Sequence, residues 1–495
     1  MAKLKPSLAG PQGGLTLSAR WRMKREIVTN GIALQPRGAA NMRITALLCA
    51  MAIATTPAYA QSMRTLQEQA EAALVAGTPA ETLRLAHEIL RANPDNFAAL
   101  YLLALAQSDL NDPQSAAASG ARAYAAATSQ DTRFETARLV AGAYFQAGHY
   151  TRSAFWLRRA ANHASTEADL RFIANAYATA VETNPFSIAV TAAIAPTDNI
   201  NNGSEDGVLR LEGIDLTFVL PEDRRALSGI GFSASTDLRY RISETANQAT
   251  TLNATLAGDT YLLSDEAKAL LADSPDPEVQ AIDGRDFATV TASVGITRQQ
   301  NNISPLGPLS LGAAVGTYWE GGERLLDFHD LSLEQTVPLG KTSRLRLRAL
   351  RRWQDARTPT LYDANIYDLT IAYDRMLANR DQLQLSLISQ RNAAGPETSF
   401  DEYQIGIGYL LAEPVFGAKF STSLNIGFRT FEEFTTTLDG REDRFYLASA
   451  TALFEDYSYF GFSPSVTVSG SRVDSTAEEN TTSAAQILFG VASRF

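Results

Sequence analysis

The chain has 495 residues, more than one compact core usually accommodates, so at least two domains are expected. Its net charge is −11, and residues 1–60 carry eight basic groups against one acidic group, so the remainder carries −18. Such an acidic body argues against a nucleic-acid partner. The single cysteine, Cys49, excludes a disulfide framework and a thiolate metal site.

An apolar stretch near the N-terminus has the pattern of a secretory signal peptide. A short charged start at Met42 precedes an apolar run of about ten residues, too short to span a bilayer, and Ala58-Tyr59-Ala60 forms an A-x-A cleavage site. We predict a signal peptide at 42–60 and a mature chain from Gln61; the alternative is a buried helix of the mature fold. Residues 1–41 are expected to reflect a start codon assigned too early or a disordered basic leader.

Residues 61–184 are predicted to form a helical-repeat domain in the periplasm. The segment is rich in Ala, Leu, Arg and Glu, with apolar residues at helical spacing and Gly, Pro and Asn breakers that leave room for roughly seven helices. Paired helices are expected to begin near Met63, Phe97, Arg133 and Ala168, which are 34, 36 and 35 residues apart. Tetratricopeptide-like repeats have this period, and a generic helical bundle is the alternative.

Four aromatic residues of this domain are candidates for a client-binding groove, because the concave faces of repeat solenoids bind extended segments of other proteins. The alternative is that each packs between helices. The candidates are Tyr144, Tyr150, Trp156 and Tyr177.

After Pro185 the hydrophobic period changes from 3.6 to 2, which predicts an outer-membrane β-barrel over 185–495. Segments of about ten alternating residues, separated by turn residues, are expected at 186–195, 228–243, 248–262, 286–298, 308–320, 325–336, 341–354, 364–375, 382–391, 400–412, 416–430, 442–453, 461–472 and 483–495.

The expected count of fourteen strands is set by topology. Segment 210–220 also alternates, but both ends of the barrel must face the periplasm, so the number must be even and this segment falls in the first outer loop. The predicted fold class is therefore α + β multidomain, a tetratricopeptide-like α-solenoid followed by a 14-stranded antiparallel transmembrane barrel. A soluble β-sandwich or propeller is the alternative.

The last strand ends in an aromatic residue, which resembles the signal read by the barrel-assembly machinery. Phe495 supplies the terminal aromatic and Gly490 fits the signal, whereas Ser493 stands where an apolar residue is usual. We expect that machinery and outer-membrane lipid to be partners of the barrel.

Arginines on segment 341–354 indicate which face of the barrel wall points inward. Arg344, Arg346 and Arg348 alternate with apolar residues. An arginine that faces lipid at mid-depth costs about 2–4 kcal/mol, so these side chains are expected to face the lumen.

A hairpin turn centred on Leu339 would set the register of these arginines against segment 325–336. It predicts two opposite-charge pairs, Glu334 with Arg344 and Asp330 with Arg348, each contributing about 0.2–1 kcal/mol. Arg346 would face Ser332 and stay free to meet an acidic client segment or hold a plug. The alternative is that the charges only fill and stiffen a polar lumen.

The junction between the two domains carries the motifs of a resemblance. Asn184-Pro185-Phe186 is followed by a strand and then by a motif that begins at Ala195 and continues through Pro196, Thr197, Asp198, Asn199, Ile200 and Asn201. Further motifs are Trp319-Glu320-Gly321-Gly322, Arg441-Glu442-Asp443, Phe462-Ser463-Pro464 and the terminal Phe495. In this order they resemble the surface lipoprotein assembly modulators over roughly residues 62–495.

The resemblance implies periplasmic tetratricopeptide repeats, a fourteen-strand outer-membrane barrel, and export of lipoproteins or related haem- and iron-acquisition proteins to the cell surface. A secreted lipoprotein or a haem- or iron-binding client is the partner it implies. For the Asp-Asn-Ile-Asn motif, turn formation is the alternative to a role in transport.

No catalytic or cofactor chemistry is expected. His329 lies between Asp327 and Asp330 without a ligand cluster, and the chain has no nucleophile elbow, phosphate-binding loop or cofactor signature. The expected function is an export translocon and not an enzyme. A polysaccharide exporter and a passive porin or structural outer-membrane protein are the alternatives.

Overall fold

The computed structural model describes residues 57–210, 216–303, 306–357, 363–435, 437, 439–457 and 462–494. The chain divides between Asn184 and Pro185 into two compact units, and each is described by itself. Most of the predicted signal peptide lies outside the described residues. Helix α2 (Pro57–Val75) includes the predicted cleavage site, so a mature start at Gln61 stays a prediction.

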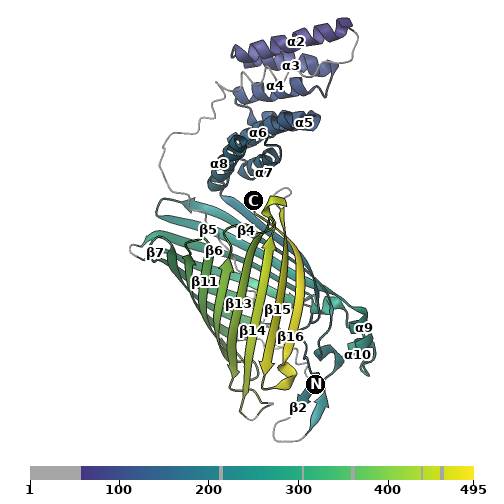
Figure 1. Ribbon diagram of the computed structural model, residues 1–495, viewed down its shortest axis with the longest axis vertical. Helices are drawn as coiled ribbons and strands as arrows, with labels where there is room; N and C mark the ends of the chain where they lie inside the picture. Colours follow the sequence, from purple (N-terminus) through teal and green to yellow (C-terminus); the bar gives the residue numbers. More distant parts are fainter. Residues whose placement is uncertain are drawn as a thin grey trace. The chain divides into compact units, whose positions relative to one another are not determined.

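Seven helices follow one another in the described part of the first unit (Figure 1). Several begin where a cap or proline favours it: Asn96 and Asp112 accept hydrogen bonds from the first-turn amides of α4 and α5, and Ser129 forms a capping box on α6. The helices are α2 (Pro57–Val75), α3 (Pro79–Ala92), α4 (Phe97–Asp109), α5 (Pro113–Ala126), α6 (Gln130–Gln146), α7 (Tyr150–Ala161) and α8 (Glu167–Thr183).

The helices pack as antiparallel neighbours in chain order. Helices α4, α6 and α8 begin 33 and 37 residues apart, close to the predicted repeat. Close packing needs small residues at the contacts: a Cβ on Gly120 of α5 would lie 2.7 Å from Val140 of α6. No helix in the described residues is long and apolar enough to cross a membrane.

Fourteen antiparallel strands of the second unit close into a barrel, which confirms the predicted fold class. Each strand pairs with its sequence neighbours, and β1 also pairs with β16. The strands are β1 (Phe186–Thr197), β4 (Gly229–Glu244), β5 (Gln248–Leu263), β6 (Thr289–Ile303), β7 (Gly307–Glu320), β8 (Glu323–Pro338), β9 (Ser343–Ala356), β10 (Ala364–Met376), β11 (Gln382–Ala393), β12 (Phe400–Leu410), β13 (Lys419–Phe431), β14 (Arg441–Leu453), β15 (Phe462–Ser475) and β16 (Thr482–Arg494).

Strand ends agree with the sequence to within a few residues, and the differences have local causes. The strand expected from residue 416 begins at Lys419, because Phe416 and Gly417 adopt positive φ values of 52° and 75° and form the preceding turn. Segment 210–220 lies outside the barrel, as predicted. Its described residues contribute to a separate two-stranded sheet, β2 (Val208–Arg210) with β3 (Thr217–Val219).

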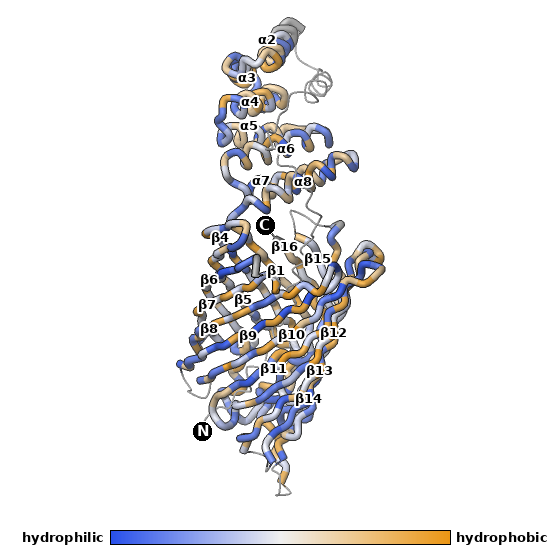
Figure 2. The backbone as a smooth tube through the Cα atoms, turned by 90° about the vertical axis from the view of Figure 1, so that its left-hand side faces the viewer, coloured by the Kyte–Doolittle hydropathy of each residue, from blue (hydrophilic) through white to orange (hydrophobic). Residues whose placement is uncertain are grey.

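Side chains alternate between the two faces of the barrel wall, and hydropathy alternates with them along the strands (Figure 2). One face carries exposed apolar residues such as Leu256, Leu331 and Ile405, while the other carries polar residues that bond across strands, such as Thr191 with Ser235. Apolar outside and polar inside is the construction of a transmembrane barrel.

The two ends of the barrel have connections of different length. At the end where β1 begins, the connections after β4, β8 and β10 have three to five residues. At the opposite end, 198–228 and 264–288 are long, and the latter contains α9 (Asp265–Ala272) and α10 (Pro277–Gln280). Short periplasmic turns and long outer loops distinguish the ends of outer-membrane barrels, so we name these the short-turn end and the long-loop end.

The ladder that closes the barrel is shorter than the one beside it. Strand β1 pairs with β4 along its whole length, Phe186–Thr197. Its pairing with β16 covers only Ala189–Ile194 and then Thr197. Pro196 has no N–H to donate in this gap.

Candidate functional site: the charged wall of the barrel lumen

Arg344, Arg346 and Arg348 of β9 face the lumen, as predicted, and the first two converge on one carboxylate. Asp374 of β10 accepts from Arg344 Nε at 2.7 Å, from Arg346 Nε at 2.8 Å and from Arg346 Nη2 at 3.0 Å. Gln384 of β11 donates to the same group at 2.9 Å. The carboxylate is only 18 % exposed, so these charge-assisted bonds fix both guanidinium groups against the wall.

A second ion pair lies closer to the long-loop end of the same wall. Arg352 of β9 donates Nε and Nη2 to the two oxygens of Asp330 at 2.8 and 2.9 Å. Its guanidinium also lies 4.0 Å from the ring centre of Phe328. This bidentate geometry, together with the ring contact, holds Arg352 in one orientation.

The predicted pairing across the β8–β9 hairpin is wrong by four residues. Glu334 lies opposite Arg348 and not Arg344, and Asp330 lies opposite Arg352 and not Arg348. The cause is the turn. The strands separate after Leu339, whose N–H bonds to Ser343 O at 2.9 Å, so the loop is centred on residue 341. A shift of four keeps every side chain on its predicted face, because the period of a strand is two.

The expectation that Arg346 stays free is also wrong, because Asp374 holds it. Sequence reasoning compared β9 with β8 alone and missed the partner on β10. Arg348 is the cation of this row that forms no ion pair with any carboxylate in the described part of the barrel. It lies between Glu334 and Thr370 in the two ladders.

A third charged cluster closes the lumen wall at the long-loop end. Arg441 makes a bidentate pair with Asp443 at 2.8 and 2.6 Å, and its guanidinium lies 4.3 Å from the ring centre of Phe431. Arg429 bonds Glu402 at 2.7 Å. Arg441, Asp443, Glu402 and Phe431 are all buried. The side chains of the Arg441-Glu442-Asp443 motif therefore alternate across the wall: Arg441 and Asp443 point into the lumen, and Glu442 points outward.

The Asp-Asn-Ile-Asn motif fastens the first long loop. Asp198 accepts from the amide of Ala485 on β16 at 2.8 Å, and buried Asn199 donates to Ser483 O and Gly203 O, both at 2.9 Å. Asn201 donates to Asp223 O and Arg225 O.

Ile200 packs with Leu227 and with Leu271 of α9. The motif therefore ties distant backbone segments together as well as shaping its own turn. Pro196 precedes it within β1.

Gly490, one residue of the proposed assembly signal, lies on β16 opposite Ala193 of β1. A Cβ at this position would come within 2.9 Å of Ser465 Oγ. The side chain of Phe495 lies outside the described residues, so the signal stays a prediction.

The four groove candidates of the helical unit have different environments. Trp156 is buried against Tyr124 in the core between α5, α6 and α7, which supports the packing alternative for this residue. Tyr144, Tyr150 and Tyr177 are half-buried, and Tyr177 accepts a hydrogen bond from Arg158. Their role in binding a client stays a prediction.

The described residues contain no group of three or more His, Cys, Asp or Glu side chains that could hold a metal ion. His329 faces outward, and its Nε2 is 4.0 Å from Asp355. The chemistry that the lumen offers is a charged, hydrogen-bonded wall.

The sequence matches no family model and no curated protein. Among solved structures, the barrel is similar to OccAB4 of Acinetobacter baumannii, at 11 % identity and TM-score 0.32 over 63 % of this chain and 99 % of that one. It is also similar to a bacterial polysaccharide outer membrane secretin, at 7 % identity and TM-score 0.33 over 62 % and 98 %. The helical part is similar to the Yersinia enterocolitica type III secretion chaperone SycD, at 10 % identity and TM-score 0.22 over 25 % and 91 %.

The fold and the lumen together define a class of protein. The chain is a closed, membrane-type β-barrel of fourteen strands with a charged lumen, preceded by paired helices of tetratricopeptide-like spacing.

Proposed function

We propose that this chain is an outer-membrane translocon that exports surface lipoproteins, or related secreted haem- and iron-acquisition proteins, from the periplasm to the cell surface. The observation that carries the proposal is one polypeptide joining a stack of paired helices to a wide barrel. Only Asn184 and Pro185 separate the end of α8 from the start of β1. Helical repeats bind extended protein segments, and a barrel supplies the passage.

The size of the barrel supports a passage. Eight-stranded barrels are filled by their own side chains, whereas barrels of sixteen to eighteen strands enclose an aqueous channel. Fourteen strands lie between these limits, and the described inward side chains of β15 and β16 are mostly small, among them Ser469, Ser471, Ala484 and Gly490. The charged clusters lie on other parts of the wall, on β8 to β10 and on β12 to β14.

The proposed orientation follows from the connections. If the long loops face the outside, the short-turn end faces the periplasm. The start of β1 and the end of β16 both lie at that end, so the helical unit joined to β1 is periplasmic. The client would meet the helices first, and the barrel-assembly machinery would insert the strands. The family resemblance of the junction motifs supports a lipoprotein or a haem- or iron-binding protein as the client.

Deletion of the chain in its own organism tests the proposal. We expect proteins encoded by neighbouring genes to disappear from the surface, measured by antibody labelling of intact cells, while their total level persists. Restoring only residues 1–60 joined to 185–495 should return a folded, heat-modifiable barrel but not export. Normal surface labelling in the deletion strain would contradict the proposal, and loss of a surface glycan instead would favour a polysaccharide exporter.

A further inference from the structure

The lipid-facing side of the barrel has a hollow lined by three arginines, two of which lie together at one side of it, and this feature plays no part in the proposed transport. The third, Arg298 of β6, donates its hydrogen bonds to Thr250 and Gln248. Arg351 on β9 and Arg391 on β11 flank Tyr367 of β10 in register. All three side chains point outward. They share the face of Leu369 on β10 and Leu387 on β11, which lie an even number of residues away and are about half exposed.

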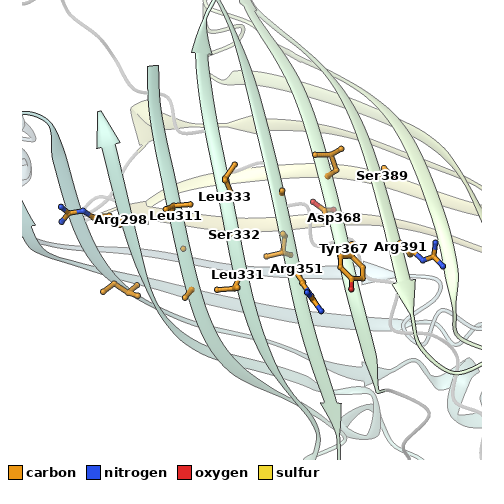
Figure 3. A pocket seen from close by; sticks show the side chains of 16 residues that line it. Arg298, Leu311, Leu331, Ser332, Leu333, Arg351, Tyr367, Asp368, Ser389 and Arg391 are labelled. Carbon is orange, nitrogen blue, oxygen red and sulfur yellow. The ribbon is translucent and has the colours of Figure 1, made fainter. Parts of the chain in front are cut away.

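The hollow lies on the outer surface and not in the lumen. It has a volume of about 760 Å³, and most of the residues that line it are outward-facing members of β6 to β11. Its floor is apolar, formed by Leu311, Leu331, Leu333, Ala349 and Leu369. Figure 3 shows Arg351 and Tyr367 on adjacent strands at one side of it, with Arg391 on the next strand.

The arginines lie where the outward face changes character toward the long-loop end. On β9, Leu345, Leu347 and Ala349 give way to Arg351, Trp353 and Asp355. On β11, Leu385 and Leu387 give way to Ser389 and Arg391. An aromatic and polar boundary of this kind marks the edge of the hydrocarbon region, where the cost of an outward arginine falls from about 2–4 kcal/mol at mid-depth to about 0–1 kcal/mol.

Neither arginine is neutralised by the protein. The Arg351 guanidinium lies 4.3 Å from the ring centre of Trp353 and 5.2 Å from that of Tyr367, and these ring contacts hold it in place without neutralising its charge. Asp401 is the outward neighbour of Arg391 in the ladder. Among the described residues, however, no carboxylate lies within ion-pair distance of either guanidinium.

We propose that this surface is a binding site for a phosphorylated glycolipid of the outer leaflet. The two guanidinium groups bind its phosphates, and the hollow takes part of its acyl chains. Arginine matches phosphate geometry with paired N–H donors, and several acyl chains on one head group suit a hollow spread over six strands. The site requires the barrel to lie in the outer membrane with its long loops outside, and it does not depend on what the barrel exports.

The test uses the full-length protein in detergent and measures bound lipid by native mass spectrometry and by the midpoint of heat-induced unfolding. The probes are bis-phosphorylated lipid A, the same lipid after phosphatase treatment, phosphatidylglycerol and inorganic phosphate. We expect lipid A to bind at least tenfold more tightly than the other three. Arg351→Ala/Arg391→Ala should lose at least tenfold in that affinity, and Arg351→Lys/Arg391→Lys should recover part of it.

Two further variants distinguish binding at this site from nonspecific attraction of lipid to any arginine on the barrel surface. Arg444→Ala removes another arginine on an exposed outward position of β14, which shares its face with Tyr446, and should leave lipid A binding unchanged. Ala349→Phe fills the hollow and should weaken binding with both arginines in place. Equal loss in the Arg444 variant, equal binding of dephosphorylated lipid, or full binding by the double alanine variant would overturn the proposal.

Discussion

Asp374 holds two arginines that would otherwise repel one another on the lumen wall, so its loss should cost more than one pair of hydrogen bonds. We expect Asp374→Asn to lower the free energy of unfolding by about 1–3 kcal/mol, because a charged group loses its partner in a poorly solvated position. The midpoint of the heat-induced mobility shift on gels measures this. Asp237→Asn is the matched control, because that inward carboxylate accepts a neutral hydroxyl bond from Thr255. If both substitutions lower the unfolding midpoint equally, the contact of Asp374 with the two arginines makes no particular contribution to stability.

Arg348 is the inward arginine of β9 that forms no ion pair with a described carboxylate, so a passing anion or an acidic segment can meet it. We expect Arg348→Glu to shift the reversal potential of the barrel in a planar bilayer toward cation selectivity and to reduce client export. The heat-modifiable barrel should remain at normal level. Arg352→Gln changes an arginine that is already neutralised by Asp330, so its effect on selectivity should be smaller. Unchanged selectivity and export in Arg348→Glu would leave the charged wall with a structural role only.

Residues differ in how far the sequence determines them. The inward orientation of Arg344, Arg346 and Arg348 could be predicted, because it depends only on alternation and on the cost of charge in lipid. Their partners could not, because a partner depends on register, and register depends on where the Pro338-Leu339-Gly340 turn closes. The ion pair between Arg346 and Asp374 joins β9 to β10, whose register depends on another connection, residues 357–363. Asp374 has the same parity as the polar residues Asp368 and Thr370 on β10, so a comparison with that strand could have found it.

Elements were easier to predict than residues because each is set by a local period. The change from 3.6 to 2 at Pro185 separates the two kinds of structure, and an even strand number follows from topology. What local patterns miss is the folding of the long loops: α9 and α10 are short, and Ile200, Leu227 and Leu271 meet there only because the barrel brings them together. The buried Arg441–Asp443 pair was also missed. The sequence shows the Arg441-Glu442-Asp443 motif but does not indicate that its charged side chains are buried in the lumen wall.

The turn after α7 and helix α5 form a pH-dependent contact in the helical unit. Tyr124 Oη and His163 Nε2 are 2.8 Å apart, and burial, followed by the charges of Arg133 and Arg159, lowers the pKa of His163 below its usual 6.5. The folded unit therefore favours the neutral ring, and the unfolded chain binds more protons in this range. The contribution to stability is complete above the unfolded pKa and is lost as the pH falls below 6.5 toward the folded pKa.

We therefore expect the thermal unfolding midpoint of residues 61–184 to fall between pH 7.5 and pH 5. Circular dichroism measures it. His163→Gln keeps a hydrogen-bonding group and cannot gain charge, so its midpoint should depend less on pH over that range. The same slope in the variant and the parent would assign the effect to other groups.

At the scale of the whole molecule, the ladder between β1 and β16, which we call the seam, has the shortest pairing in the barrel wall, so we expect it to open before the others. It spans Ala189–Ile194 and Thr197, whereas β1 pairs with β4 along its full length. If the client is a lipoprotein, as proposed, its lipid has to move from the lumen to the membrane, and a gap in the wall would provide a route. We expect a short thiol cross-link between Thr191→Cys and Ala492→Cys to block export.

A cross-link on the β14–β15 ladder between Ser449→Cys and Ser469→Cys is the control, because these inward positions also lie opposite one another. Surface labelling of the client measures export before and after the linker is cleaved. If both cross-linked barrels export equally, the seam does not open during transport.

The position of that seam also governs how the barrel can form. Thr197 pairs with Gln486, so the last ladder joins residues almost three hundred positions apart, and it cannot form before the final strand has arrived. Loop-closure entropy makes such a contact late and slow. Until then β1 and β16 both present unpaired edges that invite pairing with other chains. The interval before closure is therefore the period in which this protein most needs a chaperone, and a chain truncated before β16 would stay permanently in it.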